Sequence, residues 1–253
     1  MVATIGFQLS SITPYLATPE DIRTSFARIA ETGYRFVQLQ GVPSEIPDDV
    51  IVSALRDAGL TCVATQEDYP LGFGADPDRD IRRALACNAR YLTCALIPQE
   101  VNSVATLNDF AETLSEIADR VSEAGLIFAF HPISPDYRQM EDRMVFERLM
   151  DALPDHVQLT FCIAAAHSAG VDPALVFEKY RGRIDLVHFK DDAPQSDGTR
   201  HLMPLGQGSH DWSGILQQCD TNSVKYVFAE QERWLSDAFA CASDSYAYLT
   251  SLR

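Results

Sequence analysis

The chain has 253 residues and carries 36 acidic against 20 basic side chains, which gives a formal net charge of −16. This acidity argues against a nucleic-acid backbone or an anionic membrane surface as partner, although local cations could still hold an anionic small molecule. No apolar run reaches membrane-spanning length, and the opening MVATIGFQLS has neither the basic start nor the apolar core of a secretory signal. We therefore expect a cytoplasmic protein that binds neither nucleic acid nor membranes.

Strand and helix patterns alternate along the whole chain. Ile5, Phe7 and Leu9 alternate as in a strand, and the TPED segment at 18–21 begins a helix that stops before Gly33. The predicted strands are Thr4–Leu9, Arg35–Leu39, Leu60–Thr65, Tyr91–Ile97, Leu126–His131, Val157–Ile163, Ile184–Phe189 and Val224–Glu230. The predicted helices are Thr18–Thr32, Asp48–Ala58, Asp78–Asn88, Ser103–Ala124, Glu141–Ala152, a segment from Asp172 to Gly182, Asp211–Gln218 and Ser236–Ser251.

Eight strand–helix units in 253 residues predict an α/β protein with a (β/α)8 TIM-barrel fold. No linker rich in Gly, Ser or Pro divides the chain, so we expect one domain over residues 1–253. A doubly wound open sheet is the alternative. The barrel is preferred because the unit count fits and no strong dinucleotide fingerprint follows the first strand.

Polar groups stand at the ends of several predicted strands, where chemistry is located in α/β folds. Strand alternation turns Phe128 and Phe130 toward helices and His131 toward the interior. The same parity predicts that Cys162, His188 and Lys190 point inward. Glu230 is predicted to point inward too. The glutamines that follow this logic early in the chain are Gln8, Gln38 and Gln40.

The six cysteines form no C-x-x-C pair and no zinc-finger spacing. Several of them stand in apolar runs. We expect most of them to be reduced and buried.

Several segments together carry a family resemblance. They are GFQLSS at 6–11, ETGYRFVQLQG at 31–41, AGVDPALVFEKYRGRIDLVHFKD at 169–191, LGQGSHDW at 205–212, FAEQE at 228–232 and SYAYL at 245–249. With these segments the chain resembles the sugar phosphate isomerase/epimerase family of xylose isomerase-like barrels. The 169–191 block is the most specific part.

The resemblance implies a divalent metal, normally Mn²⁺ or Mg²⁺, held by residues at the ends of the last four strands. The positions that match are His131, Cys162, His188 and Glu230, with Cys162 where the family has an Asp. A thiol makes the set softer and favours Zn²⁺ or no metal. Gln66 also departs from the family, since it stands where relatives often carry a His.

Such a site would move a proton next to a carbonyl through an enediolate. Glu230 and His131 are the expected proton carriers, and Lys190 is expected to neutralise charge on the substrate oxygen. The Gly206–Gly208 loop could seat an anion, although an ordinary turn is the simpler interpretation. The residues expected to bind substrate are Gln8, Gln40, Gln66, His210 and Trp212. The bland alternatives are a surface histidine at 210 and a packing aromatic at 212.

The leading interpretation is a sugar or keto-sugar isomerase or epimerase, or a lyase acting through the same enediolate. The alternative is a catalytically weakened barrel that binds a sugar-like ligand or serves as a partner subunit. A Cys162–His hydrolase is disfavoured because no nucleophile elbow is visible. The sequence leaves open whether identical chains associate into a homo-oligomer.

Overall fold

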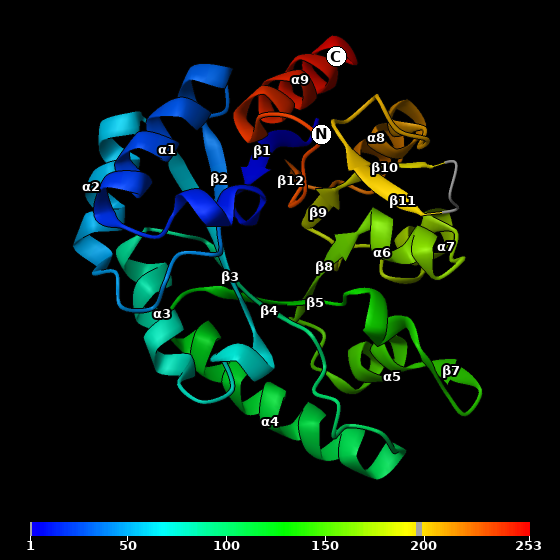
Figure 1. Ribbon diagram of the computed structural model, residues 1–253. Helices are drawn as coiled ribbons and strands as arrows, with labels where there is room; N and C mark the ends of the chain where they lie inside the picture. The colour runs from blue at the N-terminus through cyan, green and yellow to red at the C-terminus, as the bar shows by residue number, and fades with distance from the viewer. Residues whose placement is uncertain (1, 196–198) are drawn as a thin grey trace. The chain divides into compact units, whose positions relative to one another are not determined.

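A computed structural model describes residues 2–195 and 199–253, and its ribbon is shown in Figure 1. Its strands follow the order of a closed parallel barrel, β1-β12-β9-β8-β5-β4-β3-β2. The predicted (β/α)8 fold is confirmed, and the open doubly wound sheet is wrong. The barrel strands are β1 (Thr4–Gln8), β2 (Phe36–Leu39), β3 (Thr61–Asp68), β4 (Tyr91–Ala95), β5 (Ile127–His131), β8 (Gln158–Cys162), β9 (Leu186–Phe189) and β12 (Tyr226–Ala229).

Helices follow the strands along the chain, as the sequence pattern predicts. The α-helices are α1 (Pro19–Thr32), α2 (Asp48–Ala58), α3 (Pro77–Ala86), α4 (Val104–Glu123), α5 (Val145–Ala152), α6 (Ile163–Ser168), α7 (Pro173–Lys179), α8 (Trp212–Thr221) and α9 (Ala238–Ser251). Short 3-10 helices are η1 (Leu9–Tyr15), η2 (Tyr69–Leu71) and η3 (Ser134–Tyr137). Two small hairpins complete the structure, β6 (Gln139–Met140) with β7 (Arg143–Met144) and β10 (Asp191–Pro194) with β11 (Arg200–Met203).

The chain groups into two compact units. The first unit comprises Met1–Val63 and Leu186–Arg253, and the second comprises Ala64–Asp185. In the first unit the strands pair in the order β2-β1-β12-β9. In the second unit they pair in the order β3-β4-β5-β8. The expectation of one domain remains a prediction.

Side chains alternate between helices and interior in the way the strand parity predicts. In the second unit, Phe161 packs edge-on against Phe177 of α7 with ring centroids 5.2 Å apart. Its neighbour Thr160 turns the other way, and its hydroxyl lies 3.3 Å from that of Thr93 on β4. In the first unit, Phe189 stacks on Trp212 of α8 at 4.6 Å. Apolar rings therefore pack on the helix side of β8 and β9, and on β8 a polar group lies on the opposite side.

The signal for the first helix start, TPED at 18–21, is confirmed. Thr18 accepts a hydrogen bond from the backbone N–H of Asp21, and the Asp21 carboxylate accepts one from the N–H of Thr18. This reciprocal capping box satisfies N–H groups that the first turn would leave unpaired. The helix ends at Gly33, whose φ of +115° few other residues adopt.

The predicted helix over Glu141–Ala152 is wrong in its first turn. The helix α5 begins only at Val145, because residues 139–144 form the β6–β7 hairpin. Glu141 has a φ of +58°, which suits a two-residue hairpin turn and is incompatible with a helix. The β10–β11 hairpin and α6 were not expected from the sequence pattern.

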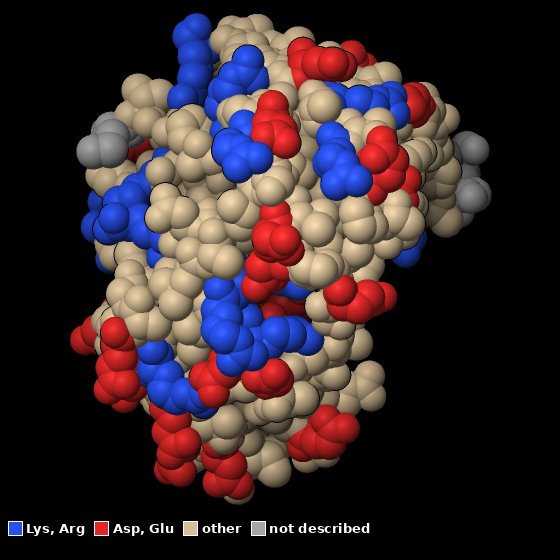
Figure 2. Space-filling model, turned by 90° about the vertical axis from the view of Figure 1, so that its left-hand side faces the viewer, with Lys and Arg blue, Asp and Glu red and all other residues tan. Residues whose placement is uncertain are grey.

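Cysteine chemistry and surface charge agree with the composition. All six cysteines are free and buried. Among the described residues, no helix combines the length and apolar composition needed to cross a membrane. Figure 2 shows one face of the molecule, on which basic side chains lie beside acidic ones. Exposed ion pairs of the chain include Arg23–Glu20 and Arg56–Asp57.

A half-buried acidic group near the end of β3, Glu67, makes the stability of the second unit depend on pH. Burial, reinforced by the negative Asp80 and opposed by Arg79 and Arg83, raises the pKa of Glu67 to about 7. Asp80 itself is buried and binds the Arg79 guanidinium at 2.8 Å. The Arg79 guanidinium therefore stabilises the negative charge of Asp80 more than that of Glu67. This explains why the Glu67 side chain favours its neutral, protonated form.

We expect Glu67→Gln to stabilise the protein above pH 7. The folded-state pKa lies above the unfolded value of 4.5, so the benefit of a protonated Glu67 is complete below pH 4.5 and is lost as the pH rises to about 7. The gain at pH 8 should be on the order of 1–3 kcal/mol. Urea unfolding at pH 4.5 and pH 8 measures it.

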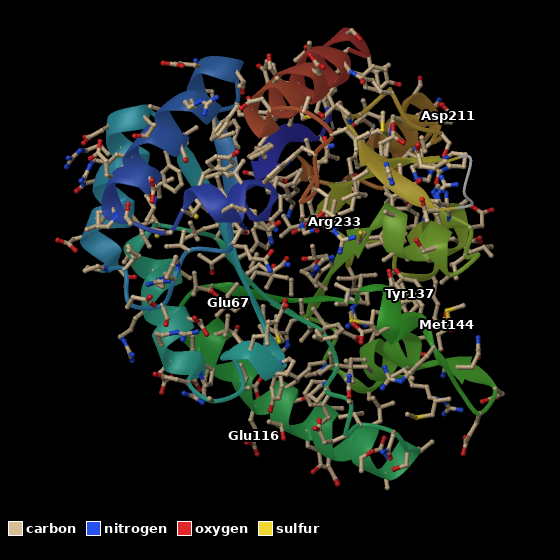
Figure 3. All side chains as sticks on the ribbon, viewed as in Figure 1. Glu67, Glu116, Tyr137, Met144, Asp211 and Arg233 are labelled. Atoms are coloured by element: carbon tan, nitrogen blue, oxygen red, sulfur yellow. The ribbon has the colours of Figure 1, made fainter. Side chains whose placement is uncertain are left out.

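A matched control is Glu116→Gln on the outer side of α4, where Figure 3 shows the side chain pointing away from the strands. This exposed carboxylate should change the free energy of unfolding by less than about 0.5 kcal/mol at either pH. If the two variants show the same pH dependence, the burial of Glu67 is not the cause.

Candidate functional site

A buried carboxylate at the end of β12 is the centre of the candidate site. Glu230 follows β12 directly and is 5% exposed. Its Oε1 accepts a hydrogen bond from the Ser10 hydroxyl at 3.2 Å. Its Oε2 lies 3.3 Å from His188 Nδ1 and 3.3 Å from Lys190 Nζ. A charged group held this far from water needs such partners to stay ionised.

His188 is held in place by a second strand. It lies on β9 and is fully buried, and its Nε2 is 2.7 Å from the side-chain oxygen of Gln38 on β2. An amide oxygen can only accept, so Nε2 carries the proton in this contact and donates it. The other ring nitrogen, Nδ1, is thereby directed at Glu230.

Lys190 bridges two carboxylates. Its ammonium lies 2.5 Å from Glu232 Oε1 as well as 3.3 Å from Glu230 Oε2. Burial and the negative Glu230 raise the pKa of Glu232, and Lys190 opposes that rise. We call Ser10, Gln38, His188, Lys190, Glu230 and Glu232 the Glu230 cluster.

Within the first unit the structure brings together most of what strand parity predicts. Glu230 contacts both His188 and Lys190. The side-chain amide of Gln8, at the end of β1, donates to the side-chain oxygen of Gln40, just after β2, at 3.1 Å. Sequence reasoning missed Ser10 and Glu232 as partners. Ser10 lies in η1 and Glu232 lies beyond the end of β12, so strand alternation does not extend to either residue.

The Gly206–Gly208 loop does bind an anion, which is the side-chain carboxylate of Asp191 in the same chain. The fully buried Asp191 carboxylate accepts backbone hydrogen bonds from Gly206 and Gly208 on Oδ2 and from Ser209 on Oδ1. A Cβ on Gly208 would lie 2.0 Å from Asp191 Oδ1, so only glycine allows this approach. The loop is therefore shaped by Asp191 and holds its place after β11.

Two of the predicted substrate-binding residues follow this loop. His210 lies with Nε2 3.2 Å from Asp192 Oδ1 and edge-on to the Trp212 ring. Trp212 is fully buried and stacked on Phe189, so it packs α8 against β9 and offers no ring face to a ligand from solvent. Trp212 is therefore a packing aromatic, and its position does not support a role in stacking on the substrate.

The second unit carries the remaining predicted residues. Gln66 lies on β3, and His131 and Cys162 end β5 and β8; all three are buried. Asp136, another acid after β5, accepts the backbone N–H of Ile97 at 3.0 Å and of Ile133 at 2.9 Å. Burial raises the pKa of Asp136 to about 6, although these two hydrogen bonds act to lower it. Because each of its oxygens holds a backbone group, Asp136 stabilises the loops after β4 and β5.

The donor set fits a divalent metal poorly. In residues 2–195 and 199–253, no three His, Cys, Asp or Glu side chains are gathered so that they could hold a metal ion. The Glu230 oxygen that would bind the ion already contacts the Lys190 ammonium, and the position that matches the family Asp is a buried thiol, Cys162. Mn²⁺ and Mg²⁺ prefer several oxygen ligands, so these residues do not fit them.

A family model described as a xylose isomerase-like TIM barrel matches residues 26–232. The chain belongs to this family. Among solved structures, a sugar phosphate isomerase/epimerase from Parabacteroides distasonis is similar, with a TM-score of 0.82, 16% identity and 99% and 94% of the two chains covered. An L-ribulose 3-epimerase structure has a TM-score of 0.74, 16% identity and coverage of 99% and 94%. At these identities the likeness concerns the fold.

Among curated proteins, the inosose dehydratase of Lacticaseibacillus casei is 27% identical over 157 residues. The match spans 55% of this chain and 52% of that protein, so the chain aligns with about half the length of its relative.

Proposed function

We propose that this protein is a sugar or keto-sugar isomerase or epimerase that moves a proton on a carbon next to a carbonyl. The observation that supports this most is the contact of the buried Glu230 carboxylate with the Lys190 ammonium at 3.3 Å. A carboxylate at a strand end can accept the proton from carbon, and an adjacent ammonium can stabilise the negative charge that develops on the carbonyl oxygen. The relatives named above include epimerases and a dehydratase, which act on substrates of this kind.

Five residues of the Glu230 cluster have a definite task in this proposal. Glu230 takes the proton from carbon, the carbonyl becomes an enediolate, and Lys190 stabilises the new oxygen charge. Ser10 donates to one carboxylate oxygen, and Gln38 orients His188, whose Nδ1 faces the other oxygen. His131 is proposed as the second proton carrier, because imidazole titrates near neutrality. A dehydratase would share the first step and then expel a hydroxyl group.

The test is exchange of carbon-bound hydrogen in D₂O. A panel of ketoses, aldoses and cyclic keto-polyols is incubated with the purified protein, and NMR follows loss of the C–H signal next to the carbonyl. At least one member should exchange or convert. Tight binding of a panel member with no exchange of any member would instead support the alternative, a catalytically weakened barrel that binds sugars.

We also propose that the protein holds zinc or no metal, in line with Cys162 at the position of the family Asp. We expect Cys162→Asp to raise the affinity for Mn²⁺ by at least about tenfold, because a carboxylate suits this ion better than a buried thiol does. Elemental analysis of the purified protein and Mn²⁺ titration by electron paramagnetic resonance measure both properties.

Cys162→Ser serves as the control, since the wild-type thiol is free and buried at the end of β8. It removes the thiol without adding a charge and should leave Mn²⁺ binding unchanged. One equivalent of Mn²⁺ or Mg²⁺ in the wild type, with no change in Cys162→Asp, would contradict the proposal.

A further inference from the structure

We propose that Arg233 is a specificity-determining residue that binds a carboxylate or phosphate group of the substrate. This inference deepens the proposed function and rests on it for the reacting end of the substrate. Arg233 is exposed and stands three residues after Glu230. Figure 3 shows it beside β9 and β12, on the side of these strands away from α8 and α9.

The guanidinium of Arg233 is uncommitted in a chain that is rich in acid. Within residues 2–195 and 199–253, it makes no ion pair or hydrogen bond with another side chain. Most other arginines of this part of the chain are paired, as Arg28 is with Asp237 and Arg200 with Asp192. With 36 acidic residues against 20 basic ones, an arginine left open beside a carboxylate cluster is a cation available to a ligand.

The turn that presents Arg233 is held rigidly. The buried Gln231 donates its backbone N–H to Ser11 Oγ at 2.8 Å. Its side-chain amide donates to the carbonyls of Leu202 at 3.2 Å and Arg233 at 3.1 Å, and its own carbonyl accepts from Trp234 Nε1 at 2.8 Å. The backbone of residue 233 is thus fixed to the β10–β11 hairpin and to η1. A fixed backbone lowers the entropy lost when the guanidinium engages a ligand.

The charges around Glu230 explain why an anionic group would bind at this place. Glu230 and Glu232 contribute two negative charges and Lys190 one positive charge, which would repel an anion from the reacting centre. Arg233 brings the second positive charge and offers a planar pair of N–H donors that match a carboxylate or phosphate. The ligand class that fits is therefore a keto-sugar with one anionic group remote from the carbonyl.

The test compares charged and neutral probes without turnover. Dissociation constants of D-glucuronate against D-glucose, and of glycerol phosphate against glycerol, are measured by NMR titration for wild type, Arg233→Met and Arg181→Met. Arg181 is the matched control, because it is an exposed arginine after α7 that likewise makes no ion pair or hydrogen bond with another described side chain. Thermal unfolding confirms that each variant is folded.

In wild type, at least one charged probe should bind about 10–100-fold more tightly than its neutral counterpart. This preference should vanish in Arg233→Met, persist in Arg181→Met and return in part in Arg233→Lys. The pair that shows it distinguishes a carboxylate from a phosphate. Equal binding of charged and neutral probes by wild type, or an equal loss in both Met variants, would overturn the proposal. Hydrogen exchange in D₂O is measured in a separate experiment. If the proposed reaction is not found, the binding constants of the probes still test the role of Arg233.

Discussion

Replacement of Glu230 with Gln is expected to lower the rate of proton exchange and of turnover by ~10²–10⁴-fold while the protein stays folded. The amide keeps the shape of the side chain and can still accept a hydrogen bond from Ser10, yet it cannot take a proton from carbon. The substrate dissociation constant should change far less than kcat, because the lost interaction acts in the transition state. Single-turnover NMR in D₂O together with probe titration separates the two.

Glu232→Gln is the matched control for this result. Glu232 touches the same Lys190 ammonium, but its side chain is 36% exposed and does not touch His188 or Ser10 in the contacts described above. Its loss should slow turnover by less than about tenfold. A Glu230→Gln enzyme close to wild type would remove Glu230 from the chemistry, and a larger loss in Glu232→Gln would move the proton carrier to that residue.

Replacement of Asp191 with Ala is expected to have the largest effect on stability, on the order of 3–5 kcal/mol. The carboxylate accepts backbone N–H groups from Gly206, Gly208 and Ser209, and its removal leaves those donors without their partner. The gap behind Gly208 adds to the loss, since that glycine lies directly against the Asp191 oxygen. Urea unfolding measured at constant pH gives the free energy.

The control for this prediction is Asp211→Ala, at a side chain that Figure 3 labels at the start of α8. Asp211 is exposed and caps its helix by accepting a hydrogen bond from the Gly214 N–H at 3.1 Å. Its replacement should cost about 1 kcal/mol, the ordinary value for an N-cap. Equal losses in the two variants would mean that the buried Asp191 contributes no more to stability than an exposed helix cap does.

Local patterns were enough to predict the architecture of this chain. The alternation of strand and helix periods gave all eight barrel strands, and strand parity placed Phe161 and Phe189 toward helices. Both patterns depend on residues that are close in sequence, so one sequence suffices to recognise them. The same parity directed His188, Lys190 and Glu230 to one side, and their contact follows once β9 and β12 are neighbours.

What the sequence could not provide are contacts between residues far apart along the chain. Ser10 and Glu230 are separated by 220 positions, and His188 and Gln38 by 150, so no local period links them. The hairpin at 139–144 was missed because a left-handed Glu141 has no local signature as strong as glycine. The role of Asp191 was hidden for another reason. A carboxylate can be recognised as the anion of a glycine loop only when the folded chain brings the loop around it.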